Sequence, residues 1–291
     1  MLQGRRMAPA VVAGIDLTTM GRRVADRARL VAEGIGGEVE LVHVLESVGE
    51  AMIEPGLARL MRAHQRQEAR KIADWVAERT PVDVTLEIVK GSPAWELVSR
   101  AKKVDLVALG SSTVDAFSGG PVTLRVARMA LSDVLIVRRQ PRVPYRRILA
   151  AVDFSEASRA AVSRALEMFP DADVTVMYSL PARFDPILSD AGLFTEEMEA
   201  SRNSRIEAAK DRMLEFTQPW DGDVRTMVTD GPPAENIDEA VRRRGADLVV
   251  VGSRGASATR MVLLGTVPEA LVGHAPCDVL IARSPATFRR P

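Results

Sequence analysis

The residues best suited to chemistry lie near the C-terminus, where glycines and a threonine follow an apolar run. Gly252, Gly255, Gly265 and Thr266 form the pattern Gly-x2-Gly-x9-Gly-Thr, from DLVVVGSRG to GTVPEALVGHAPCDVLIAR. Glycines after a buried strand let backbone N–H groups approach an anion, and a helix start adds a partial positive charge. The pattern predicts a phosphate-binding loop. The alternative is that these glycines only form a tight strand-to-helix turn.

Similar segments occur in the same order in both halves of the chain. VVAGIDLT (11–18) matches ILAAVDFS (148–155), GSPAWELV (91–98) matches GPPAENID (231–238), and VDLVALGSS (104–112) matches ADLVVVGSR (246–254). The repeat predicts a tandem duplication, with domains at residues 1–141 and 145–291. The segment RRQPRVPYRR joins them, and its two prolines interrupt the periodicity.

Short apolar runs alternate with segments of helical spacing in each half, which predicts α/β domains with parallel sheets covered on both faces. The long helix after the second strand is expected to carry an apolar face made of Leu57, Leu60, Met61, Ile72, Trp75 and Val76.

Composition narrows the function classes. The 291 residues carry a formal net charge of 0, so no overall positive field favours nucleic acid. Because Cys277 is the single cysteine, an internal disulfide is excluded. The sequence contains no run of 18 apolar residues, so no membrane span is predicted. These features lead us to expect a cytoplasmic protein. His43, His64 and His274 are scattered without a nucleophile or metal partner nearby in sequence, so structural roles are favoured for them.

The segments VDFS, DGPPAENI and the glycine pattern before HAPCDVLIAR resemble the universal stress protein family over essentially the whole chain. The resemblance implies a Rossmann-like open sheet in each half, with strand order 3-2-1-4-5. It also implies a ligand crevice beyond the adjacent ends of strands 1 and 4. The nucleotide-binding positions that it implies are Ala151, Asp153, Ser179, Gly252, Arg254, Gly255, Gly265, Thr266 and Val267.

Particular roles follow from the resemblance for some of these residues. Asp153 would accept hydrogen bonds from ribose hydroxyls, and Thr266 would donate to phosphate. Arg254 would either reach a phosphate or remain a solvated loop residue. Ala151 and Ser179 stand where ATP-binding relatives often carry proline and valine, which would alter the base preference.

The N-terminal copy of the glycine pattern is degenerate. Gly120 and Pro121 align with the last glycine and threonine of the intact pattern, but the interval from Gly110 is three residues shorter, and Thr113 replaces the second glycine. Pro121 also lacks the hydroxyl and the backbone N–H that a phosphate would use. Asp16 and Val44 keep their expected positions, which leaves a second ATP site as an alternative. Because the glycine pattern is degenerate, however, this half is expected to be structural or to bind a different ligand.

The resemblance therefore implies a tandem stress-response regulator or interaction protein that binds ATP or a related adenine nucleotide, with or without Mg²⁺, in its C-terminal domain. The expected assembly is a homodimer in which the last strands of the two domains pair within each chain. Two alternatives remain at this point. One is a slow ATPase or nucleotide-dependent transferase, and the other is a scaffold that binds no nucleotide.

Overall fold

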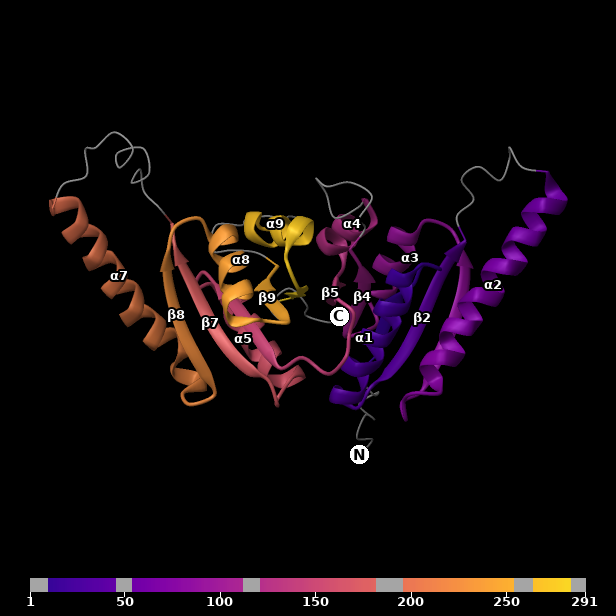
Figure 1. Ribbon diagram of the computed structural model, residues 1–291, viewed down its shortest axis with the longest axis horizontal. Coiled ribbons are helices and arrows are strands. Elements are labelled where there is room, and N and C mark those ends of the chain that lie inside the picture. The colour runs from indigo at the N-terminus through magenta and orange to yellow at the C-terminus, as the bar shows by residue number, and fades with distance from the viewer. Residues whose placement is uncertain (1–9, 46–53, 112–120, 182–195, 254–263, 284–291) are drawn as a thin grey trace, which may run out of the picture. The chain divides into compact units, whose positions relative to one another are not determined.

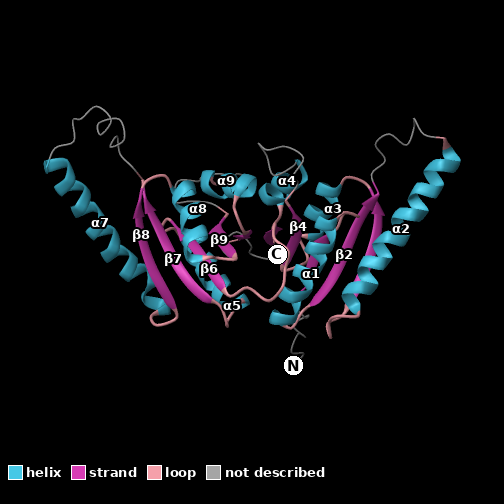
Figure 2. Ribbon diagram, viewed as in Figure 1, coloured by secondary structure: helices cyan, strands magenta, loops and turns pink. Residues whose placement is uncertain are grey.

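The computed structural model describes residues 10–45, 54–111, 121–181, 196–253 and 264–283 (Figure 1). The chain divides into two compact parts, one of residues 1–144 with 272–274 and 278–280, the other of residues 145–271 with 275–277 and 281–291. Elements are assigned below by sequence, to an N-terminal unit up to Pro144 and to a C-terminal unit from Tyr145 onward. Within the described residues each unit contains strands and helices in alternation, as Figure 2 shows. No helix of this part of the chain is long and apolar enough to cross a membrane.

The strands of the N-terminal unit are β1 (Ala10–Gly14), β2 (Glu38–Leu45), β3 (Val84–Lys90), β4 (Leu106–Gly110) and β5 (Asp133–Val137). Its helices are α1 (Thr19–Ile35), α2 (Pro55–Ala77), α3 (Pro93–Arg100) and α4 (Pro121–Met129). The strands of the C-terminal unit are β6 (Arg147–Val152), β7 (Asp173–Leu180), β8 (Val224–Asp230), β9 (Leu248–Gly252) and β10 (Asp278–Ala282). Its helices are α5 (Glu156–Met168), α7 (Glu196–Thr217), the short 3-10 helix η2 (Gln218–Trp220), α8 (Pro233–Arg244) and α9 (Thr266–His274).

The strand order confirms the predicted fold class. It is β3-β2-β1-β4-β5 in the N-terminal unit and β8-β7-β6-β9-β10 in the C-terminal unit, so each unit has the order 3-2-1-4-5 in its own numbering. The strands β1 and β2 run parallel with Gly14 opposite Val42, and β6 and β7 with Ala151 opposite Met177. All five residues of β9 are buried. A continuous apolar strand of this kind is expected where helices cover both faces of a sheet.

Local signals set the ends of several helices. The hydroxyl of Thr18 accepts a hydrogen bond from the N–H of Met20 and thereby caps α1. Gly36 ends α1 and Gly245 ends α8, each with a φ of 63°. Glycine adopts this left-handed conformation without the steric penalty of a Cβ atom.

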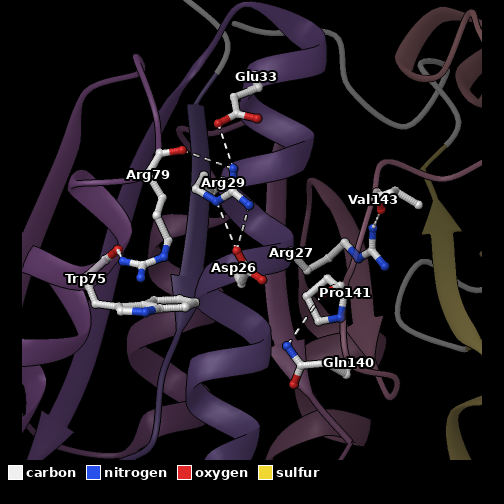
Figure 3. Close-up of polar contacts among 9 residues, drawn as sticks. All are labelled: Asp26, Arg27, Arg29, Glu33, Trp75, Arg79, Gln140, Pro141 and Val143. Carbon is white, nitrogen blue, oxygen red and sulfur yellow. Dashed lines mark hydrogen bonds and ion pairs between the residues drawn. The ribbon is translucent and has the colours of Figure 1, made fainter.

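Arginines of α1 connect this helix to other parts of the N-terminal unit (Figure 3). The guanidinium of Arg29 donates to Asp26 Oδ1 at 2.8 Å and to the carbonyl of Arg79, just after α2, at 3.4 Å. Nη1 of Arg27 donates to the carbonyl of Val143 at 3.0 Å. These bonds hold α1 against the end of α2 and against the last residues of the unit.

The apolar face predicted for α2 is only partly buried. Ile72 and Val76 are 3% and 0% exposed, as expected, but Leu57, Leu60 and Met61 are 51%, 68% and 46% exposed. The cause is the length of the helix, because the first turns of α2 extend past the ends of the neighbouring strands (Figure 1).

Candidate functional site

The strands whose ends were expected to flank a nucleotide crevice, β6 and β9, run side by side. Ala151 of β6, which is half-buried, pairs with Val251 of β9, so the carboxyl ends of both strands meet at one edge of the sheet. Asp153 follows the first strand and Gly252 ends the second. Ligands of open parallel sheets bind beyond such ends, where the strand order reverses. The fold thus places Asp153 and Gly252 at the same edge.

Hydrogen bonds at the start of α5 orient Asp153. Its Oδ1 accepts from the N–H of Ser155 at 3.0 Å, and its own N–H donates to Ser158 Oγ at 3.4 Å. Ser155 Oγ in turn accepts from the N–H of Ser158 at 3.1 Å and caps the helix. The half-buried Asp153 is therefore held beside the first turn of α5.

Aromatic rings surround the residue after Asp153. Phe154 has a φ of 63°, a left-handed conformation that is costly for a residue with a Cβ atom. Its ring centroid lies 4.3 Å from that of Tyr178 and 5.5 Å from that of Phe216. The guanidinium carbon of Arg212 lies 4.5 Å from the Phe154 ring centroid. We call Phe154, Tyr178 and Phe216 the aromatic cluster, and its packing offsets the backbone strain.

Gly252 is required by the packing of α5 on β9. A Cβ atom at this position would lie 2.8 Å from the carbonyl carbon and oxygen of Ala157 and 3.1 Å from the backbone nitrogen of Ser158. Real Cβ atoms do not approach backbone atoms this closely. The glycine at the end of β9 thus has a structural cause that is independent of any ligand.

Gly265 and the residues after it form the start of α9. Gly265 caps the helix with φ −66° and ψ 159°, and its N–H donates to the carbonyl of Ser253 at 3.2 Å. Thr266 is exposed and Val267 is half-buried. Pro268 has no N–H. The first-turn amides that can reach a ligand are therefore those of Thr266 and Val267.

Ser179, near the end of β7, is hydrogen-bonded to the turn between β8 and α8 and to α8 itself. Its hydroxyl donates to the carbonyl of Gly231 at 2.9 Å and accepts from Asn236 Nδ2 at 2.8 Å. Asn236 Nδ2 also donates to the carbonyl of Asp230 at 3.1 Å, and Gly231 has a φ of 122°. The segment DGPPAENI thus has a structural explanation, in which Asn236 is a key residue that the sequence did not single out.

Arg254 and Gly255 lie outside the described residues, as do Thr113 and Gly120 of the N-terminal copy. Among the residues that the structure describes, no group of three or more His, Cys, Asp or Glu residues is arranged to hold a metal ion.

The N-terminal unit contains a cavity of about 800 Å³ at the same edge of its own sheet. The ends of β1, β2 and β4 and the helices α1 to α4 contribute to its lining. Its polar residues include Asp16, His43, Arg62, Gln65 and Thr123. Its volume falls in the range of small-molecule sites.

Asp16 and Thr123 are held by hydrogen bonds to the backbone around them. Oδ1 of Asp16 accepts from the N–H of Gly21 at 2.8 Å and from the hydroxyl of Thr18 at 2.6 Å, so Asp16 caps the first turn of α1. The hydroxyl of Thr123 donates to the carbonyl of Gly110 at 2.9 Å. Thr123 thereby connects the start of α4 to the end of β4.

His43 lines the cavity, although the sequence analysis favoured only a structural role for it. Its Nδ1 lies 3.1 Å from the carbonyl oxygen of Ile15, and its Nε2 is buried without a hydrogen-bond partner in the described part of the chain. The available signal was its place directly before Val44, at the carboxyl end of the second strand.

Comparisons with known proteins agree with this architecture. The model of the family described as "Universal stress protein family" matches the chain twice, over residues 7–138 and 144–283. A universal stress protein of Methanocaldococcus jannaschii is 28% identical over 143 residues, which are 48% of this chain and 84% of that protein. The crystal structure of a universal stress protein from Archaeoglobus fulgidus is similar over 96% of this chain and 97% of that one, with a TM-score of 0.72 and 17% identity. A functionally unknown protein from Pseudomonas aeruginosa is similar over 96% of this chain and 94% of that one, with a TM-score of 0.63 and 16% identity.

Proposed function

The chain belongs to the universal stress protein family, and from this premise we propose that it binds ATP or a related adenine nucleotide in its C-terminal unit. In this proposal the protein is a cytoplasmic stress-response regulator or interaction protein rather than a fast enzyme. The observation that carries the proposal is the place where β6 and β9 meet, with Asp153 at one strand end and the glycine-capped start of α9 following the other.

The two sides of the β6–β7 sheet support a division of roles. Side chains alternate between the faces of a strand. Ser179 bonds to Asn236 of α8, so this side chain faces the layer that contains α8. Its neighbour Tyr178 lies on the opposite side, within the aromatic cluster. The rings of the cluster therefore leave the α8 side of the crevice to the base and ribose.

The phosphates would lie at the start of α9, where Thr266 offers its hydroxyl and its amide. Hydrogen bonds to charged groups contribute roughly 1.5–3 kcal/mol each. Three or four such bonds support a binding free energy of about −8 kcal/mol, or micromolar affinity, after the cost of association. Any Mg²⁺ would be held chiefly by the phosphates themselves.

Gly265→Val tests the proposal. A φ of −66° suits valine, so the backbone at this position tolerates the change while the added side chain blocks close approach of a phosphate. We expect calorimetric titration to show at least a tenfold loss of ATP affinity, equivalent to about one lost charge-assisted bond. Thr226→Val, at an exposed position of β8, is the matched control and should bind like the wild type.

Unchanged affinity in Gly265→Val would contradict the placement of the phosphates, and no heat with the wild-type chain would favour a scaffold that binds no nucleotide. Release of inorganic phosphate that Asp153→Ala abolishes would instead support slow hydrolysis of ATP.

We also propose that the protein is a homodimer in which the last strands of the two halves pair within each chain. The support is the similarity of SDVLIVRR (132–139) to CDVLIARS (277–284), because matched apolar strands favour a pseudo-two-fold arrangement. Sedimentation equilibrium of the full chain gives the oligomeric state, and a monomer at micromolar concentration would contradict the dimer.

A further inference from the structure

An open groove of about 600 Å³ runs along β8 in the C-terminal unit, where Met227–Asp230 line it. Its wall on the α8 side consists of Asn236, Glu239, Ala240, Arg243 and Arg244. These residues are spaced i, i+3, i+4, i+7 and i+8, so they form one stripe of the helix. The stripe is about 12 Å long, which matches about four residues of an extended strand. The groove therefore suits an extended segment of chain.

The strand β8 is the outer strand of its sheet. Of the described strands it pairs only with β7, and the N–H of Gly231 donates to the carbonyl of Leu180 at the end of β7 at 2.9 Å. Backbone groups of successive residues point alternately to the two sides of a strand, so the N–H and C=O groups of Thr226 and Val228 point away from β7. A row of such groups is a template for an added strand.

Side chains on both faces of β8 border the groove. Ser179, which faces α8, is the register partner of Thr229, so Thr229 and Met227 face the same layer. Asp230 faces the other way, because its Oδ2 lies 2.5 Å from Nε of Arg202 in α7. A strand added at this edge would likewise direct its side chains alternately toward α8 and toward α7.

The arginines of the α8 wall favour an acidic partner. Arg243 and Arg244 are exposed in the last turn of the helix. Arg243 forms an ion pair with Glu239 at 3.2 Å, and exposed pairs of this kind are weak, so the guanidinium remains available. The guanidinium of Arg244 has no ion-pair partner in the described part of the chain. Carboxylates on the α8 side of an added strand would meet these two arginines.

The corresponding edge of the N-terminal unit carries a cluster of ion pairs instead. The match of GSPAWELV with GPPAENID makes Arg100 the counterpart of Ala240, and Glu87 and Met227 are each the fourth residue of the outer strand. Arg100 forms ion pairs with three carboxylates, those of Glu40, Glu87 and Glu96. Charged side chains commonly protect a sheet edge from added strands. Alanine and methionine cannot form these ion pairs, so β8 lacks this protection.

We propose that the groove along β8 binds an extended acidic segment of a partner protein by strand addition. The backbone of the segment bonds to the outward N–H and C=O groups of Thr226 and Val228, and its carboxylates contact Arg243 and Arg244. The groove includes neither Thr266 nor any other residue of α9, so this binding does not depend on nucleotide binding.

Synthetic peptides test the charge and the backbone bonds on the unaltered full-length chain. A peptide that alternates valine and glutamate should bind at least about tenfold more tightly in fluorescence anisotropy than one with lysine in place of glutamate. Two further acidic peptides carry N-methyl groups on all valine amides or on all glutamate amides, which point to opposite edges of a strand. Strand addition predicts that only one of these two loses affinity, again by about tenfold or more.

Equal losses for the two methylated peptides, or none, would contradict strand addition. Equal binding of the acidic and basic peptides would contradict the role of the arginines. No binding of the acidic peptide at about 1 mM would overturn the proposal as a whole.

Charge reversals locate the peptide. Arg244→Glu should weaken binding of the acidic peptide by about tenfold. Arg242→Glu is the matched control, because Arg242 is exposed in the same turn but lies outside the groove, 3.8 Å from Asp238. At physiological salt it should bind within about twofold of the wild type. Equal effects of the two changes would refute the placement. Self-association that Arg244→Glu abolishes, without peptide binding, would assign this edge to a second copy of the chain and would also refute the proposal.

Discussion

Two glycines of the same sequence pattern have different physical causes. Gly252 lies against the first turn of α5, where a Cβ atom would meet the Ala157 carbonyl at 2.8 Å. Gly265 has an ordinary φ of −66° and caps α9. The backbone conformation of Gly265 therefore does not itself require glycine. The pattern is therefore part packing requirement and part candidate phosphate site.

Gly252→Ala is expected to destabilise the protein in the absence of nucleotide. The added methyl group forces α5 away from β9, and overpacking of this kind costs typically 1–3 kcal/mol. Urea denaturation checks the change. Gly273→Ala is the control, because a Cβ atom there has no neighbour within 4 Å. Equal stability of the two variants would show that α5 yields without cost.

At the scale of elements, Arg100 connects α3 to β2 and β3. Its guanidinium bonds to Glu40 at 3.1 Å, to Glu87 at 2.5 Å and to Glu96 at 2.7 Å. The hydrogen bond from Arg100, followed by one from Glu40, lowers the pKa of the Glu87 carboxyl. Burial raises the pKa of Glu40, against the opposing effect of Arg100. This cluster stabilises the N-terminal unit most when Glu87 is ionised.

The stabilisation by Glu87 should depend on pH. Because its pKa is lowered on folding, the stabilisation is present above the unfolded value of about 4.3 and is lost as pH falls through the folded value. Glu87→Gln should therefore lower the melting temperature at neutral pH by roughly 1–4 °C, a small effect because Glu87 is half exposed. The difference should vanish toward about pH 3. Glu78→Gln, with an exposed carboxylate 3.7 Å from Arg79, serves as the control, and a difference that is independent of pH would exclude the mechanism.

The order of helices and strands was predictable from the sequence, whereas the direction and exposure of individual side chains near the strand ends were not. Apolar runs and glycine caps indicated the strands and helix ends, and the family resemblance supplied the order 3-2-1-4-5. The direction in which the His43 side chain points depends on strand register and on its hydrogen bond to Ile15, and the spacing of residues in the sequence does not encode either. The exposure of Leu60 likewise depends on how far α2 extends past the strands. Long-range geometry decides such details.

At the scale of the whole molecule, the duplicated halves have diverged at their strand ends. The C-terminal half keeps the glycine pattern, while the N-terminal half has Pro121 at the first residue of α4. The 800 Å³ cavity lies in the N-terminal unit. The two copies of the fold thus keep the same strand order while their strand ends differ.

The number of nucleotides bound per chain tests this difference between the two halves. We expect equilibrium dialysis with ATP to give one bound molecule per wild-type chain and about half a molecule or less for Gly265→Val at the same concentrations. Two molecules per chain would show that the shortened N-terminal loop still accepts phosphates. In that case Asp16→Ala should remove one of the two and leave the other.

Because Tyr178 corresponds to His43, one half of the chain can serve as an internal reference for measurements on the other half. Each residue lies in the second strand of its half, one position after the register partner of Gly14 or of Ala151. Changes in temperature, salt or denaturant act on both copies in one sample. A spectroscopic label placed at equivalent sites in each half would share these background effects, so the difference between the two signals would report only what the few exchanged side chains bind.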